Sequence, residues 1–277
     1  MNQAVVNATQ ANYFWYNGEL KNGTTLELNI NEPGLVYGAT VFTTLRVRER
    51  NLNHPLTNWD AHKSRLQHSL QTLGWQMPDW ELLEQGAVAL TEYYPILRVT
   101  VFPDGRELVS GRNLPPNLSQ LQQQGITAWV AAAPQFNREL PNLKTGNYLA
   151  SWLALEKARQ IGAQEAILID AAQNWRETAT GNLWGWRDEC WFTPPLSAGI
   201  LPGITRSQIW EFLKRDNQKI VEKSWNEEFV KELDAIAYTN CAIELIPLHT
   251  VLTPNQTLHY NPAHPSLNYL KTCFHQS

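Results

Sequence analysis

Two segments in the second half of the chain contain side chains that could do chemistry. Lys144, in NLKTGNYLASW, precedes a predicted helix. A lysine amine enclosed in a cleft has a lowered pKa and becomes a nucleophile that can form a Schiff base. A solvated lysine at a helix start is the simpler interpretation, although a cation in the first helical turn opposes the helix dipole. Glu177, in RETATGNLWGW, begins a predicted strand, where glutamate is uncommon unless one face is exposed.

A third segment could bind a phosphate group. In ILPGITR, Ile200 to Arg206, a Pro-Gly turn leads into a helix that is predicted to begin near Thr205. Free N–H groups at a helix N-terminus, together with a threonine hydroxyl, form a phosphate site, although an ordinary capped helix has the same sequence. With a phosphate here, Glu177 could hold a pyridinium nitrogen protonated, which makes pyridoxal phosphate an electron sink.

Other cofactor motifs are absent from the sequence. It contains no GxGxxG, no GxxxxGK[ST], no GxSxG and no HExxH, and its seven histidines form no short pair typical of metal ligands. The sequence therefore predicts no dinucleotide, ATP, serine-hydrolase or metal site.

The order of lysine, glutamate and glycine-turn helix start resembles that of the class IV aminotransferases, the fold-type IV pyridoxal-phosphate enzymes. The resemblance extends from Trp15-Tyr16-Asn17-Gly18 to Ile246-Pro247. This family includes branched-chain and D-amino-acid aminotransferases and aminodeoxychorismate lyase. The resemblance implies pyridoxal 5'-phosphate as cofactor, a small-molecule substrate, and a homodimer with the site near the subunit contact.

The same resemblance implies a role for each matching residue. Lys144 corresponds to the Schiff-base lysine, with Tyr148 one helical turn further on, and Glu177 corresponds to the partner of the pyridine nitrogen. Arg65 matches the phosphate-binding arginine, and the remaining matches lie in two phosphate-side loops. The expected cofactor-binding residues are Arg65, Lys144, Tyr148, Glu177, Ile204, Thr205, Asn240 and Cys241. The family often has a small hydroxyl residue where Cys241 stands.

The strand YGATVFTTLRV, Tyr37 to Val47, is the most informative segment for the substrate. Alternation places Phe42, Thr44 and Arg46 on one face, which is too polar for a core and which the family turns toward the substrate. Transaminases commonly have an acidic residue and a glycine after the phenylalanine. Thr43-Thr44 here is instead similar to the Phe-Thr-Thr of aminodeoxychorismate lyases, although threonine is also simply a good strand former.

The resemblance is therefore closest to aminodeoxychorismate lyase. It implies conversion of 4-amino-4-deoxychorismate to 4-aminobenzoate and pyruvate, a step in folate precursor synthesis. Lys144 and Thr44 would be the catalytic residues. The expected substrate-binding residues are Tyr37, Phe42, Thr44, Arg46 and Arg98. An aminotransferase acting on branched-chain or D-amino acids is the alternative on the same scaffold, and a tryptophan-rich carbohydrate-binding module is the alternative from another class.

The elements that must position these residues form an α/β (α+β) pattern. We expect a small N-terminal α/β domain over residues 1–133, a linker over 134–143 and a larger β-rich, cofactor-binding domain over 144–277. The first domain is expected to contain strands at Tyr13–Tyr16, Thr25–Ile30, Thr40–Arg48, Ile96–Phe102 and Ile126–Ala132, and helices at Asp60–Gly74 and Asp79–Tyr93. The second is expected to contain helices at Gly146–Ile161 and Thr205–Lys214, with strands at Glu165–Asp170, Glu177–Trp186 and Cys190–Thr193 and near Ile220 and Ala235.

Composition narrows the class of protein. The 277 residues carry a net charge of −4, which argues against a general nucleic-acid binder. The longest apolar stretch, Ile126 to Ala133, is far too short to span a membrane. Residues 1–13 lack the pattern of a signal peptide, and three cysteines without a CxxC pair indicate a reducing compartment, so we expect a cytoplasmic protein.

Overall fold

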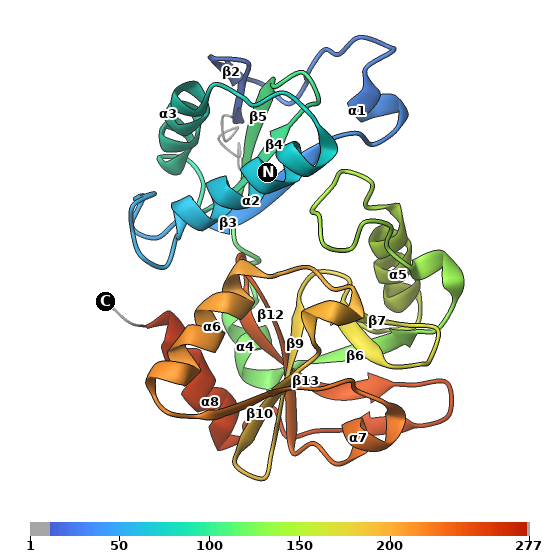
Figure 1. Cartoon of the computed structure of the whole chain (residues 1–277). Helices are drawn as coiled ribbons and strands as arrows, with labels where there is room; N and C mark the ends of the chain where they lie inside the picture. Colours follow the sequence, from blue (N-terminus) through green and yellow to red (C-terminus); the bar gives the residue numbers. More distant parts are fainter. Residues whose placement is uncertain (1–11, 276–277) are drawn as a thin grey trace, which may run out of the picture.

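The computed structural model describes residues 12–275, so the expectation about a signal peptide concerns a segment that lies almost entirely outside the described residues. Figure 1 shows an N-terminal unit above a larger unit. The N-terminal unit contains β1 (Tyr13–Tyr16), β2 (Glu19–Asn22), α1 (Pro33–Val36), β3 (Val41–Arg46), α2 (Trp59–Leu73), α3 (Trp80–Thr91), β4 (Ile96–Val101) and β5 (Glu107–Arg112). The mixed α and β architecture predicted from the sequence is confirmed.

The larger unit contains the remaining elements. Its helices are α4 (Leu118–Gln124), α5 (Leu149–Gln160), α6 (Ile204–Arg215), α7 (Glu227–Lys231) and α8 (Pro265–Lys271), with short 3-10 turns at Pro134–Phe136, Leu196–Ala198 and Thr272–Phe274. Its strands are β6 (Ile126–Ala131), β7 (Glu165–Ile169), β8 (Trp175–Thr178), β9 (Asn182–Arg187), β10 (Cys190–Thr193), β11 (Lys219–Glu222), β12 (Ala235–Asn240), β13 (Glu244–Leu252) and β14 (Thr257–His259). None of the helices within residues 12–275 combines the length and the apolar character needed to cross a membrane.

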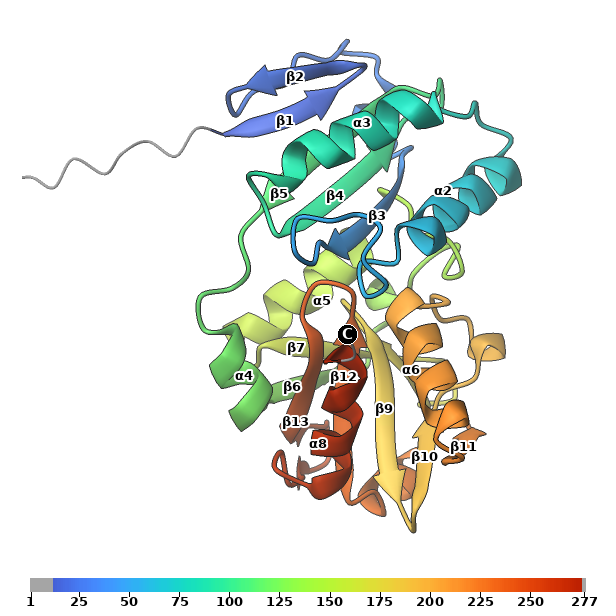
Figure 2. The ribbon, with the colours of Figure 1, turned by 90° about the vertical axis from the view of Figure 1, so that its left-hand side faces the viewer.

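The first sheet is antiparallel throughout, in the order β2-β1-β5-β4-β3. Helices α2 and α3 bury their apolar side chains on one face of it, where Leu66, Leu70 and Leu83 pack against the strands (Figure 2). α2 ends where Gly74 adopts a left-handed φ of 66°. The opposite face of this sheet is turned toward the larger unit and carries the polar side chains of β3 and β4.

The expected strand over Thr25–Ile30 is wrong. Asn17 and Gly18 both have positive φ, 48° and 82°, and form a two-residue turn that leads immediately into β2, with Tyr16 opposite Glu19. The turn was predicted correctly, but the strand that pairs with β1 follows it without a gap. Residues 25–29 are irregular.

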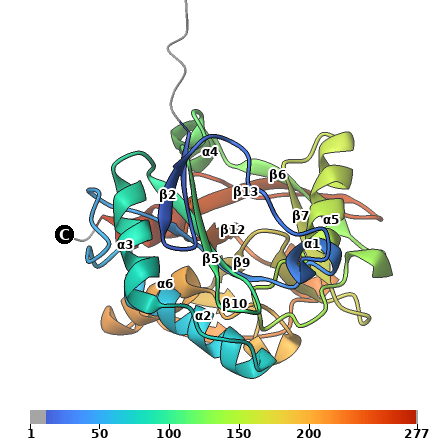
Figure 3. The ribbon, with the colours of Figure 1, turned by 90° about the horizontal axis from the view of Figure 1, so that it is seen from above.

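The second sheet is mixed and follows the order β11-β10-β9-β12-β13-β6-β7-β8, with β14 added to β13. Neighbours β10–β11, β13–β6 and β6–β7 are parallel, and the other pairs are antiparallel. Helices α6 and α8 cover one apolar region of this sheet, and α5 packs near β7 (Figure 3).

Two sequence expectations about strands are corrected here. The strand at Ile126–Ala131 belongs to the second sheet, because β6 pairs with β13 and β7, so it does not complete the first α/β unit. The chain thus passes between the sheets after β5, through a segment that contains Pro115 and Pro116, rather than at the expected linker. The domain boundaries at 133 and 143 stay a prediction.

The expected single strand Glu177–Trp186 is also wrong. It is divided into β8 and β9 by a turn over residues 179–181, in which the Thr178 N–H donates to the Gly181 carbonyl at 2.8 Å. β8 is the last strand along the sheet order, whereas β9 lies in its interior. Because so short a turn joins them, the second sheet must curl on itself, and the turn lies at the face that meets the first unit.

Candidate active site

Lys144 is held by backbone pairing with the first sheet. The Phe42 N–H donates to the Lys144 carbonyl at 2.8 Å, and the Gly146 N–H donates to the Thr40 carbonyl at 2.7 Å. α5 begins at Leu149, three residues later than the expected start at Gly146, so Lys144 lies well outside the first turn of the helix. The macrodipole argument does not apply, and an extended segment beside β3 positions this lysine instead.

The Lys144 amine lies in a cavity between the two units. Its Nζ is 4.8 Å from the ring centre of Phe42 and 5.7 Å from that of Tyr148. Burial, together with the positive charges of Arg65 and Arg138, lowers the pKa of Lys144 to about 7. At neutral pH a large share of this amine is therefore unprotonated and nucleophilic.

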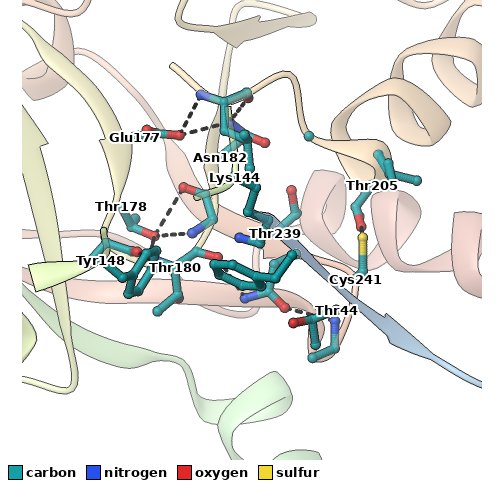
Figure 4. A pocket seen from close by; sticks show the side chains of 18 of the residues that line it. Thr44, Lys144, Tyr148, Glu177, Thr178, Thr180, Asn182, Thr205, Thr239 and Cys241 are labelled. Carbon is teal, nitrogen blue, oxygen red and sulfur yellow. Dashed lines mark hydrogen bonds between the residues drawn. The ribbon is translucent and has the colours of Figure 1, made fainter. Parts of the chain in front are cut away.

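Glu177 is a buried carboxylate with three donors around it. Arg138 Nη1 donates to it at 2.5 Å, the Leu201 N–H at 3.1 Å and Asn182 Nδ2 at 3.4 Å (Figure 4). Burial raises the pKa of Glu177, and Arg138 opposes that rise. The ion pair keeps a negative charge available at the cavity wall.

Sequence reasoning missed Arg138. It lies in the segment interpreted as a linker, where its guanidinium also donates to the carbonyls of Pro141 and Leu143 at 3.2 and 3.1 Å. The only feature that marks it in the sequence is that Arg138 is the one cation in PQFNRELP, which does not by itself indicate a site. The segment therefore forms part of the cavity wall and fixes the chain just before Lys144.

The N-terminus of α6 lines the other end of the cavity. Gly203 precedes the helix, and no side chain caps it, so the first N–H groups of α6 are left for a ligand. A Cβ on Gly203 would lie 1.9 Å from Asn182 Oδ1, so a side chain there would displace either the Asn182 amide or the start of α6. Arg65, on α2, donates to the Pro202 carbonyl at 2.5 Å and brings a positive charge to the same end.

The loop after β12 completes this end of the cavity. Cys241 Sγ accepts a hydrogen bond from Thr205 Oγ1 at 3.2 Å. The Asn240 side chain is engaged in the turn, since its Oδ1 accepts from the N–H groups of Ala242 and Ile243 and its Nδ2 donates to the Thr180 carbonyl. Thr239 Oγ1 is buried without a hydrogen-bond partner, at a position that lines the cavity.

The first sheet supplies the opposite wall. Phe42 and Thr44 of β3 line the cavity, as the alternation of this strand predicted, and Arg98 lies over the Phe42 ring at 3.6 Å. Arg112, at the end of β5, lines the same side and was not selected from the sequence. Within residues 12–275 neither Arg98 nor Arg112 has a carboxylate partner.

Most of the residues selected from the sequence therefore lie around one cavity, which encloses about 960 Å³ including its open mouth. Those that line it are Phe42, Thr44, Arg65, Arg98, Lys144, Tyr148, Glu177, Ile204, Thr205, Asn240 and Cys241. In the part of the chain that the structure describes, no group of three or more His, Cys, Asp or Glu side chains could hold a metal ion.

Two selected residues lie elsewhere. The side chain of Tyr37 follows α1 and is 77% exposed, outside the cavity lining. Arg46 borders a small neighbouring cavity and forms an ion pair with Glu244 at 3.0 Å, which Arg48 also contacts. The substrate-binding roles of Tyr37 and Arg46 stay predictions that this single chain does not support.

Comparison with known proteins assigns the family. The family model for amino-transferase class IV matches residues 40–251, and the chain belongs to that family. The branched-chain-amino-acid aminotransferase of Salmonella typhimurium is 27% identical over 273 residues, covering 87% of this chain and 85% of the relative. The aminodeoxychorismate lyase of Vibrio harveyi is 21% identical over 263 residues, covering 89% and 94%.

Solved structures share the fold. A crystal structure of Escherichia coli branched-chain amino acid aminotransferase matches with a TM-score of 0.80 and 24% identity, covering 96% of this chain and 94% of the other. The PLP-bound form of a hypothetical aminotransferase from Mycobacterium tuberculosis matches with a TM-score of 0.79 and 18% identity, covering 93% and 96%. The predicted fold-type IV architecture is thereby confirmed.

The cofactor of this enzyme is pyridoxal 5'-phosphate, and the cavity fits it. Lys144 supplies an amine of lowered pKa, and Glu177 supplies a buried carboxylate for a ring nitrogen. The uncapped N-terminus of α6, Arg65 and the unpartnered Thr239 hydroxyl suit a phosphate. The alternative of a carbohydrate-binding module is wrong, and several tryptophans such as Trp184, Trp191 and Trp225 are buried core residues.

Proposed function

We propose that this chain is a pyridoxal-phosphate-dependent lyase that converts 4-amino-4-deoxychorismate to 4-aminobenzoate and pyruvate. The observation that supports this most is the pair Arg98 and Arg112, which lie on the substrate side of the cavity without a carboxylate partner among the described residues. The substrate carries two carboxylates, and guanidinium groups bind carboxylates in a directed, bidentate way. A purely apolar substrate would leave both cations without a function.

In this proposal, residues of the cavity have separate roles in proton removal, carboxylate binding and departure of the leaving group. The cofactor, when bound, withdraws electrons from the substrate carbon that carries nitrogen. The Lys144 amine removes the proton from that ring carbon, and Arg98 and Arg112 hold the two carboxylates. The Thr44 hydroxyl hydrogen-bonds to or protonates the departing enolpyruvyl oxygen. The ring then becomes aromatic, which supplies much of the driving force.

Glu177 supports this chemistry from the far side of the cavity. Its carboxylate, balanced by Arg138, favours a protonated pyridine nitrogen, because a buried negative charge stabilises an adjacent positive one. The three donors to Glu177 hold its side chain in one orientation. The roles of Ile204, Thr205, Asn240 and Cys241 as phosphate-side residues are part of the same proposal.

An aminotransferase acting on branched-chain or D-amino acids is the second candidate. The observation in its favour is the identity of 27% with a branched-chain aminotransferase, against 21% with an aminodeoxychorismate lyase. On this scaffold Lys144 would carry a proton between the substrate carbon and the cofactor, and a keto acid would be released. Both candidates need the same lysine, so only the substrate side can separate them.

The test is a product assay on the purified holoenzyme with enzymatically generated aminodeoxychorismate. Equimolar 4-aminobenzoate and pyruvate are expected, and Arg98→Met and Arg112→Met should each raise KM about tenfold or more while leaving the visible absorbance of the bound cofactor unchanged. Arg159→Met, at an exposed ion pair on α5, is the matched control. A keto acid formed from an amino acid, with no 4-aminobenzoate from the first substrate, would reject the lyase in favour of the aminotransferase.

We further propose a cytoplasmic homodimer. α1 and the start of α5 both expose large apolar side chains: Leu35 is 64% exposed, Val36 50%, Leu149 60% and Trp152 53%. The chain just after α1 approaches the chain just before α5, since a Cβ at Gly38 would lie 3.3 Å from the Asn147 backbone nitrogen. Exposed apolar patches of this kind mark interaction surfaces. Tyr37 adjoins the patch, so a second copy that covers it would place this residue at the contact. Sedimentation equilibrium of the holoenzyme should give twice the mass of one chain.

A further inference from the structure

Glu165 is a buried carboxylate outside the cavity lining, and the proposed chemistry gives it no role. It begins β7 and is 2% exposed. Its Oε1 accepts from the Ala166 N–H at 2.9 Å, and Thr180 Oγ1 donates to its Oε2. No salt bridge to Glu165 occurs among residues 12–275, so N–H and O–H donors alone satisfy it. A buried polar group of this kind is costly unless its partners are firmly placed.

The turn above Glu165 is the wall of the cofactor cavity. Thr178, Ala179, Thr180 and Gly181 all line the cavity, and they join β8 to β9 immediately after Glu177. The Ala179 N–H donates to the Ala166 carbonyl at 2.8 Å, so the turn is tied to β7 by backbone as well as by the Thr180 side chain. Thr180 is a half-buried residue with its hydroxyl directed at Glu165 and its backbone at the cavity.

The same turn makes two contacts to other parts of the site. The Tyr148 hydroxyl donates to the Ala179 carbonyl, and Tyr148 in turn packs beside Lys144. Asn240 Nδ2 donates to the Thr180 carbonyl at 3.1 Å, and Asn240 organises the loop that carries Cys241. A shift of this turn would therefore move the ring of Tyr148 and the phosphate-side loop together.

The groups that face Glu165 do not offer it an alternative partner. The positive charge of Arg159 on α5 lowers the pKa of Glu165. The negative charge of Glu165 in turn helps to raise the pKa of Tyr148 and of Tyr238. The residue opposite Glu165 on β6 is Ala128, which has no polar side chain. Burial raises the pKa of Glu165 to about 7, and the hydrogen bond from Thr180 opposes this rise.

We infer that Glu165 is a positioning residue for the cofactor, which acts through the Thr180 hydroxyl to fix the turn Thr178–Gly181 against the bound ring. It touches neither substrate nor cofactor. The inference rests on the presence of the cofactor and not on the choice between lyase and aminotransferase. Its failure and the failure of the proposed function are therefore distinguishable.

The test measures the dissociation constant of pyridoxal 5'-phosphate from the apoprotein, by tryptophan fluorescence and visible absorbance, in a double-mutant cycle. Glu165→Met removes both carboxylate oxygens, and with them the acceptor for the hydroxyl, while Thr180→Val removes the hydroxyl at nearly constant volume. Each variant should weaken binding about tenfold, and the double variant should weaken it by about the same factor, because both changes break one interaction. A double variant weakened by the product of the two single factors would overturn the inference.

Two further variants separate positioning from general damage. Thr180→Ser keeps the hydroxyl and should bind the cofactor within about twofold of the wild type, whereas an effect as large as that of Thr180→Val would overturn the inference. This comparison decides the matter even if Glu165→Met does not fold. Glu156→Met, at an exposed carboxylate on α5 that pairs with Arg159, is the matched control and should leave the affinity unchanged.

Discussion

The surroundings of Lys144 lower the pKa of its amine, so the reactivity of this one residue should depend on pH near neutrality. With a pKa of about 7, roughly a tenth of the amine is neutral at pH 6 and nine tenths at pH 8. Only the neutral amine attacks a carbonyl, so the rate at which the apoprotein captures pyridoxal phosphate should rise about tenfold over this interval and then level off. Stopped-flow absorbance would measure it.

A simple aliphatic amine under the same conditions corrects for the titration of the cofactor itself. Its rate should continue to rise well above pH 8, because an unburied amine has a pKa near 10.4. A protein rate that follows the free amine at every pH would contradict the lowered pKa of Lys144. The Lys144→Ala variant should show no capture and a loss of turnover of at least about 10³-fold.

At the scale of an element, the N-terminus of α6 depends on one glycine. Gly203→Ala would place a Cβ 1.9 Å from Asn182 Oδ1, and Asn182 also contacts Glu177 and the Leu201 carbonyl. Either the Asn182 amide or the start of α6 must then move, and both line the cavity, so affinity for pyridoxal phosphate should fall about tenfold or more. Apoprotein titration with the cofactor measures this.

Ser207→Ala, one turn further along α6, is the matched control. It removes only a hydrogen bond of 3.2 Å from the Ser207 hydroxyl to the Gly203 carbonyl, and the N–H groups at the helix start stay in place. Its cofactor affinity should stay within about twofold of the wild type. An equal loss in both variants would show that the helix as a whole, and not its first turn, determines binding.

Elements also show which parts of the sequence were informative. Regular amphipathic spacing predicted α2 and α3 to within a few residues, because each buries one face on the first sheet. The break between β8 and β9 was missed, because the turn that makes it, Ala179-Thr180-Gly181, is held by Glu165 and β7 as well as by local hydrogen bonds to Thr178. β6 belongs to the second sheet because it pairs with strands more than thirty residues away in the sequence. The periodicity of a short segment carries no information about such distant partners.

Some residues of the candidate site could likewise be predicted from the sequence, and others could not. Lys144, Glu177 and the α6 start were recognisable because their chemistry is local to a short segment. Arg138 and Arg112 were not, since an arginine in a linker or at a strand end has no pattern until the fold brings it to the cavity. Arg46 has the alternation of a cavity residue, but it pairs with Glu244 of the other sheet and does not line the cavity.

At the scale of the whole molecule, Glu244 joins the two sheets by its contacts with Arg46 and Arg48. Arg46→Met should therefore lower the free energy of unfolding by about 1–3 kcal/mol, because the pair is largely shielded from solvent, and should leave KM unchanged within about twofold. Denaturant unfolding and steady-state kinetics measure the two effects.

Arg50→Met is the control for this prediction, since Arg50 forms an exposed ion pair with Glu92 within the first unit. Its effect on unfolding should be below about 1 kcal/mol. A rise in KM of tenfold for Arg46→Met, with unchanged stability, would instead restore the substrate-binding role that the sequence suggested for Arg46.

The backbone bonds from Phe42 and Gly146 have a consequence for solvent exchange. Both amide protons are shared between β3 and the segment that carries Lys144. They can exchange with deuterium only when the sheets part locally, so their protection factors report how often the reacting amine meets bulk water. Ligands that fill the cavity should slow exchange at these two amides together, whereas the exchange rates of amides within β4 should not change.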